Sequence, residues 1–100
     1  MTTISFKRCG GFVGTGMRFE LSLDQLPSRE SEVLRHLIEQ AGFFNLPENL
    51  IVKFHPDEYQ YTITVDTEWM SHTVRTNDTT MPESLRPLVE ELSALRSVAG

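Results

Sequence analysis

The 100-residue sequence has one cysteine, few cations and no long apolar run, and each shortage excludes a class of protein. Because Cys9 is alone, no intrachain disulfide can form, and a free thiol is typical of a reducing compartment. Nine Lys and Arg against 14 Asp and Glu leave a net charge of −5, which argues against nucleic acid or an anionic membrane as the partner. No apolar stretch approaches the roughly 20 residues of a membrane-spanning helix. Since Met1–Lys7 also lacks the pattern of a signal peptide, we expect a cytoplasmic protein.

Patterns for metal binding and catalysis are missing as well. None of the histidines, His36, His55 and His72, has another ligand-type residue at metal-binding spacing on the same element. Cys9 with His72 and Asp78 would be a conceivable nucleophilic set, but no local pattern supports it. The chain therefore predicts no metal, no cofactor and no enzymatic activity.

The most distinctive feature that is present is the glycine-rich stretch Gly10–Gly16, with the sequence GGFVGTG. Alternating apolar residues on both sides predict a β-hairpin with strands over residues 2–9 and 17–23. Two residues suffice for a tight turn, so four glycines need another explanation. The loop either presents Phe12 to a partner, which we favour, or forms a glycine bulge that returns Phe12 to the core.

The next segment has the 3.6-residue periodicity of a helix. Apolar residues at helical spacing predict a helix over residues 28–41, with Ser28 as its N-cap and Gly42 as its stop. Phe43–Pro47 cannot continue the helix, because Pro47 favours an extended residue before it. We expect these residues to form an apolar clip over one end of the core. Residues 48–57 are loop-like, with a short strand or a packed turn at 50–54.

A second hairpin follows. Tyr59–Asp66 alternates cleanly between apolar and polar residues and predicts a strand. Residues 67–70 form its connection, and residues 71–76 return as the fourth strand. Two faces of that last strand are candidates for the core, and we choose the one with His72, Val74 and Thr76 because it contains valine.

The last apolar stripe, Leu85–Leu95, predicts a second helix. Its regular part should begin near residues 84–85, because Pro87 is tolerated only in a first turn. The element order β-β-α-β-β-α predicts an α+β fold, in which two hairpins form a four-stranded antiparallel sheet with both helices on one face. We expect residues 1–100 to form a single domain and the protein to be a monomer.

Several short motifs occur in a characteristic order along nearly the whole chain. They are Gly10–Gly14, Leu26-Pro27, Gly42–Pro47, Tyr61–Val65, His72–Arg75, Asp78-Thr79 and Pro82–Leu88. Each motif alone is weak, but the ordered set resembles the emfourin family. These are small bacterial proteins that inhibit thermolysin-like zinc metallopeptidases.

The resemblance implies an inhibitor that occupies the active-site cleft of a thermolysin-like metallopeptidase as a reversible, uncleaved ligand. Such peptidases favour a bulky apolar residue just after the scissile bond, so Phe12 would fill that pocket. The expected partner-binding residues are Gly10, Gly11, Phe12, Val13 and Gly14. The alternative is a non-enzymatic interaction or adaptor module that binds a different protein through the exposed edge of the sheet.

Overall fold

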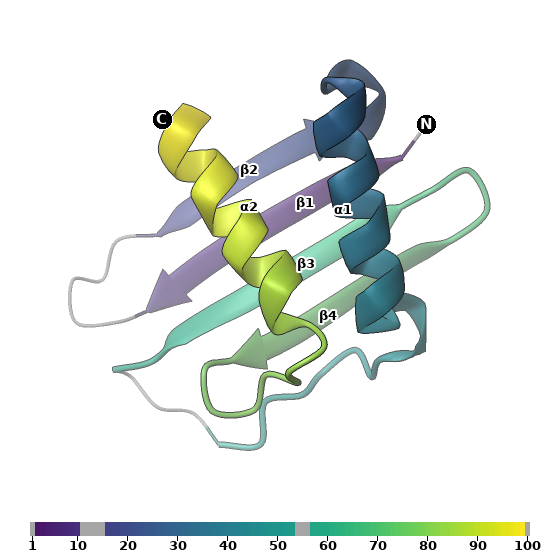
Figure 1. The fold of residues 1–100 in the computed structure, drawn as a ribbon. Helices are drawn as coiled ribbons and strands as arrows, with labels where there is room; N and C mark the ends of the chain where they lie inside the picture. Colours follow the sequence, from purple (N-terminus) through teal and green to yellow (C-terminus); the bar gives the residue numbers. More distant parts are fainter. Residues whose placement is uncertain (1, 11–15, 54–56, 100) are drawn as a thin grey trace.

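The computed structural model describes residues 2–10, 16–53 and 57–99, with side chains as far as Leu95. Its helices and strands follow the predicted order β-β-α-β-β-α (Figure 1). They are β1 (Thr3–Gly10), β2 (Met17–Ser22), α1 (Ser28–Ala41), β3 (Tyr59–Asp66), β4 (Ser71–Asn77) and α2 (Arg86–Ala99). Two short 3-10 turns, η1 (Leu23–Gln25) and η2 (Phe43–Asn45), flank α1.

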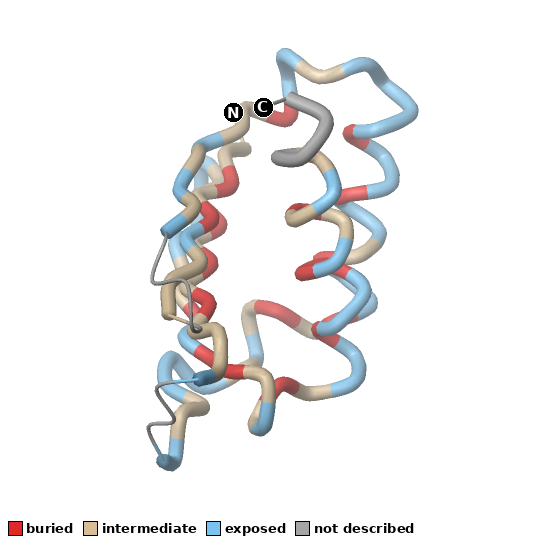
Figure 2. Tube along the Cα trace, turned by 90° about the vertical axis from the view of Figure 1, so that its left-hand side faces the viewer, coloured by how far each residue is buried: buried red, intermediate tan, exposed pale blue. Residues whose placement is uncertain are grey.

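The strands form one antiparallel sheet in the order β2-β1-β3-β4, which confirms the two predicted hairpins. The hairpins join through β1 and β3, where Phe6 lies opposite Ile63. Both helices cover the same face of this sheet, as Figures 1 and 2 show. In the described part of the chain no element covers the other face, which we call the open face.

The core lies between the covered face and the two helices. Strand residues alternate between the two faces, so every second side chain of β1, β3 and β4 enters the core. Buried apolar residues of this interface include Ile4, Phe6, Ile63, Val65 and Val74 from the sheet, and Leu34, Ile38, Leu85, Leu88 and Leu92 from or next to the helices. Apolar residues of β2, such as Phe19 and Leu21, are partly buried against them. Val74 and Thr76 are both buried, which confirms the face chosen for β4.

The helix ends agree with the sequence except at the start of α1. The predicted N-cap Ser28 is the first helical residue, and Pro27 before it provides no side-chain cap, so the N-cap prediction was wrong. At the other end Gly42 adopts the left-handed conformation with φ 60° and donates its N–H to Glu39, as expected. Pro87 is the second residue of α2, in its first turn, as predicted. None of the described helices has the length and apolar character to cross a membrane.

The segment after α1 folds over one edge of the sheet. Phe43 is buried at 1% exposure, whereas Phe44 is only partly buried against the same core. The chain then runs beside β4, where the Arg75 N–H donates to the Glu48 carbonyl and the Leu50 N–H donates to the Arg75 carbonyl, each at 2.8 Å. These bonds pair part of the β4 edge. Residues 50–53 form no strand, and Phe54, the last residue of the expected short strand or packed turn, lies outside the described residues.

Candidate functional site

The predicted binding loop joins β1 to β2 at one end of the sheet. Residues 11–15 lie outside the described residues, and with them lie Gly11, Phe12, Val13 and Gly14, four of the five predicted contact residues. The structure describes what holds this loop: Gly10 at the end of β1, and the residues of β3 and β4 beside it.

Gly10 must be glycine for two separate reasons. Its φ is +95°, a conformation that residues with a Cβ rarely adopt. A Cβ at this position would also lie 2.6 Å from the carbonyl oxygen of Glu58, which is backbone and cannot move aside alone. Gly10 pairs with Tyr59 at the start of β3. The chain therefore enters the loop from a backbone position held tightly against the neighbouring strand.

A polar and aromatic cluster fixes the same end of the covered face. Asp78, directly after β4, accepts hydrogen bonds from the Tyr59 N–H at 3.1 Å and from the Tyr61 hydroxyl at 2.9 Å. The Arg8 guanidinium lies 4.6 Å from the centre of the Tyr59 ring, in cation–π contact. Burial, and secondly the hydrogen bond to Asp78, raise the pKa of the Tyr61 phenol well above its ordinary value. We call Arg8, Tyr59, Tyr61 and Asp78 the loop-end cluster.

A second set of hydrogen bonds ties the connection before β3 to the turn after β4. Asn77 is 1% exposed, and its side-chain amide donates to the Lys53 carbonyl at 3.1 Å. Its side-chain oxygen accepts from the Thr80 N–H at 3.0 Å and from the Thr80 hydroxyl at 2.6 Å. The Thr79 hydroxyl donates to the Glu58 carboxylate. These two connections of the chain are thus joined at the end of the sheet from which the glycine-rich loop departs.

The structure does not assemble the conceivable nucleophilic set. Cys9 lies opposite Gln60 on β3, whereas His72 lies opposite Val65, five positions further along that strand. At about 3.3 Å per residue the two side chains are separated by about 17 Å. The His72 Nε2 instead contacts the Leu46 carbonyl at 2.6 Å. Cys9 therefore has neither His72 as a base nor an arrangement for nucleophilic catalysis with it.

The other candidate ligands are also dispersed. His36 is exposed on α1, and His55 lies outside the described residues. Across residues 2–10, 16–53 and 57–99, no group of three or more His, Cys, Asp or Glu side chains could hold a metal ion.

Sequence reasoning assigned no binding role to the loop-end cluster. The sequence did contain one indication of it. Arg8 follows Ile4 and Phe6 on the same face of β1, and a cation on the face that packs against the helices needs a polar or aromatic partner. The alternation of Tyr59 and Tyr61 put two aromatic rings on that face. Asp78 could not be connected with them, because 17 residues separate it from Tyr61.

Comparison with known proteins gives a family for this chain. The solved structure of emfourin from Serratia proteamaculans, described as an M4 family peptidase inhibitor, is 17% identical and aligns with a TM-score of 0.48, over 87% of this chain and 84% of that one. No curated protein matches the sequence significantly. The model of the emfourin family matches residues 6–93, which run from the middle of β1 through β2, α1, β3 and β4 to the middle of α2. By this match over most of its length, the chain belongs to the emfourin family.

Proposed function

We propose that this protein inhibits a thermolysin-like metallopeptidase by inserting the glycine-rich loop 10–16 into the active-site cleft. The observation that carries the proposal is membership of the emfourin family, whose members are peptidase inhibitors and not enzymes. Phe12 would act as the apolar anchor, and Gly10, Gly11, Val13 and Gly14 would allow the backbone to approach the peptidase closely.

The loop-end cluster supports this proposal physically. Binding is costly when a loop must be ordered at the same time, and a loop whose ends are already fixed loses less freedom. Gly10 is held against Glu58, and Asp78 fixes the start of β3 through Tyr59 and Tyr61. The two ends of the loop are also paired across the hairpin, where Arg8 lies opposite Met17.

A second candidate is an adaptor that adds a partner strand to the sheet. In the described part of the chain β2 pairs only with β1, which leaves its outer edge without a strand. The β4 edge is less available, because residues 48–50 bond to Arg75 there. Exposed edges of this kind bind extended peptides by main-chain hydrogen bonds.

The test compares two aromatic residues at opposite ends of the sheet. Phe12→Ala should weaken inhibition of a thermolysin-like peptidase by about 30-fold, because an anchor of this size contributes about 2 kcal/mol. Trp69→Ala is the matched control, since Trp69 is 88% exposed in the β3–β4 connection. It lies about 25 Å from the loop end, one length of β3, and should leave inhibition unchanged. Inhibition constants and melting temperatures are measured on each purified variant.

Each outcome identifies one interpretation. If Phe12→Ala lowers the melting temperature but keeps inhibition in the folded protein, Phe12 belongs to a bulge packed on the core. If Trp69→Ala weakens inhibition and Phe12→Ala does not, the peptidase binds the other end of the sheet. If the wild-type protein inhibits no thermolysin-like peptidase at micromolar concentration, the inhibitor proposal fails and the adaptor takes its place.

A further inference from the structure

The open face of the sheet carries a row of cations that the proposed loop contact does not use. Strand pairing puts Arg18 opposite Lys7, Lys7 opposite Thr62, and Thr62 opposite Arg75. These four residues share one face and cross all four strands. Since neighbouring strands lie about 4.8 Å apart, the row is about 14 Å long. Lys7, Arg18 and Arg75 are all exposed, and we call these three residues the cationic row.

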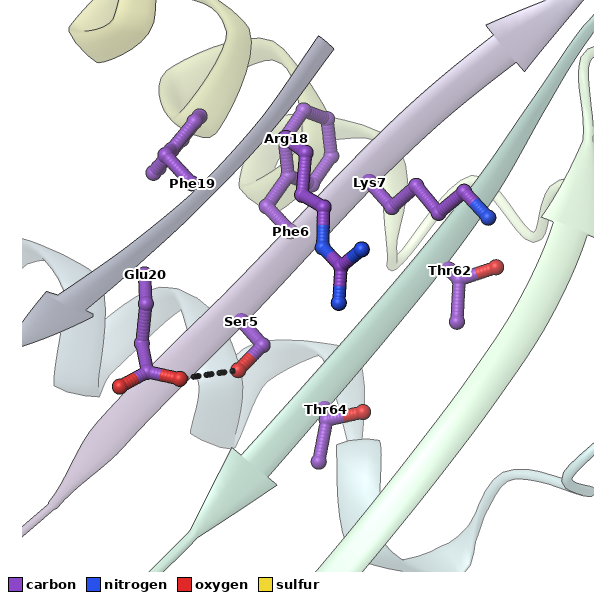
Figure 3. A pocket seen from close by; sticks show the side chains of 8 residues that line it. All are labelled: Ser5, Phe6, Lys7, Arg18, Phe19, Glu20, Thr62 and Thr64. Atoms are coloured by element: carbon purple, nitrogen blue, oxygen red, sulfur yellow. Dashed lines mark hydrogen bonds between the residues drawn. The ribbon is translucent and has the colours of Figure 1, made fainter. Parts of the chain in front are cut away.

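A shallow hollow lies beside the cationic row. It has a volume of about 290 Å³, and the side chains of Lys7, Arg18, Ser5, Thr62 and Thr64 line it together with Glu20, Phe6 and Phe19. Figure 3 shows Arg18 extending over β1 and Lys7 extending over β3, with the two threonines on the same side of the sheet. The hollow thus combines two cations and one carboxylate, Glu20, with the hydroxyl groups of Ser5, Thr62 and Thr64.

The charges of the row are only partly compensated locally, because Glu20 is the one carboxylate among the residues that line the hollow with Lys7 and Arg18. The protein has only nine Lys and Arg residues and a net charge of −5, yet three of its cations share this row. Glu20 lies in the adjoining row and accepts a hydrogen bond from Ser5 at 3.2 Å. Among the described residues, no carboxylate lies within salt-bridge distance of Lys7, Arg18 or Arg75. Nearby like charges repel each other, so this arrangement favours an anionic group from outside the chain.

We infer that the cationic row binds an acidic, extended segment on the surface of the protein partner. Carboxylates form charge-assisted hydrogen bonds with Lys and Arg, and the Thr62 hydroxyl of the hollow adds a donor, whereas the Ser5 hydroxyl already donates to Glu20. Side chains on one face of an extended segment recur every 6–7 Å or so, so two or three carboxylates can lie along a row of this length. A nucleic acid fits less well, because its dense charge would be repelled by the net charge of −5.

The cationic row lies close to the proposed binding loop. That its partner is a thermolysin-like peptidase rests on the proposed function. Lys7 is three residues before Gly10, and Arg18 is two residues after Gly16, so both lie within about 10 Å along their strands of the loop that should enter the peptidase. If the loop enters the active-site cleft of a peptidase, the peptidase surface next to the cleft would lie beside the cationic row. Charges at the rim of an interface mainly accelerate association.

The experiment removes the row and, separately, an equal charge elsewhere. The row variant is Lys7→Gln, Arg18→Gln and Arg75→Gln together. The control replaces three exposed helix residues, Arg29→Gln, Arg35→Gln and Arg86→Gln. Association and dissociation rates with a thermolysin-like peptidase are measured at 50 and 300 mM salt. The row variant should associate about tenfold more slowly at low salt, with little difference at high salt, because salt screens exposed charges. The control should change the rate less than twofold.

The outcomes separate this inference from the proposed function. If the row and control variants associate equally fast and still inhibit, the row is not a contact surface and the inhibitor proposal stands. If the wild-type protein inhibits no such peptidase, an NMR titration with an acetylated hexaglutamate peptide decides the question of the row. Chemical-shift changes confined to residues near Lys7, Arg18 and Arg75 support the inference. Changes spread evenly over the protein, or none at millimolar peptide, overturn it.

Discussion

The two faces of the sheet are made by alternate residues of the same strands, but they differ in burial and in polarity. On the covered face Ile63 and Val65 are buried at 0% and 1% exposure. On the open face Thr62 and Thr64, their immediate neighbours, are only partly buried and line a hollow. Stability should therefore depend on one face and binding on the other. The open face can change its charges without disturbing the core, since its side chains never enter it.

The largest effect should come from the covered face at the clip. Phe43 is 1% exposed, and its ring centre lies 5.7 Å from that of Phe44 and 5.6 Å from that of His72. Phe43→Ala should lower the free energy of unfolding by about 3–5 kcal/mol, the range for a fully buried phenylalanine. Phe44→Ala is the matched control and should cost clearly less, because Phe44 is only partly buried. Urea unfolding measures both, and equal losses would contradict the assigned burial.

This pair also shows how far sequence reasoning reaches. The period of two in Tyr59–Asp66 predicted a strand, and the helical period of Leu85–Leu95 predicted a helix. Because the apolar face of each must be buried, the helices were expected to pack on the sheet. Neither period extends through Phe43 and Phe44, which lie in a 3-10 turn just after a helix stop. The sequence alone therefore predicted an apolar clip but could not say which ring is buried.

The candidate site was less predictable for a different reason. The glycines of residues 10–16 indicated a special loop, because their spacing is local in the sequence. The loop-end cluster depends on contacts between β1, β3 and the turn after β4, which no local pattern encodes. The cationic row likewise depends on strand register: Lys7 and Arg75 become part of one row only because both lie opposite Thr62.

An intermediate effect should come from Tyr61, at the loop end of the covered face. Tyr61→Phe removes the hydrogen bond to Asp78 and should cost about 1–2 kcal/mol at pH 7. The raised pKa of the folded Tyr61 phenol gives this loss a pH dependence. The unfolded tyrosine releases its proton at a pH of about 10 while the folded one retains it. The advantage of the wild-type protein is thus complete below that pH and shrinks as the pH rises above it.

Unfolding of both proteins by urea at pH 7, 9, 10 and 11 measures the difference. Subtracting the two free energies removes the contribution of every group that does not interact with Tyr61. A difference that stays constant from pH 7 to pH 11 would show that Tyr61 titrates alike in the folded and unfolded states.

The smallest effect should come from the open face, where a hydroxyl can be removed without changing shape. The hydroxyl oxygens of Thr64 and Thr73 lie 2.8 Å apart in hydrogen-bond contact. Thr64→Val deletes one of them, but water reaches this face and valine suits a strand, so the loss should be about 0.5 kcal/mol or less. Val65→Thr makes the opposite exchange at the next residue, on the covered face at 1% exposure. It buries a hydroxyl and should cost about 1–3 kcal/mol. If urea unfolding gave equal losses for the two variants, the open face would be covered in solution, and the contrast between the faces would not hold.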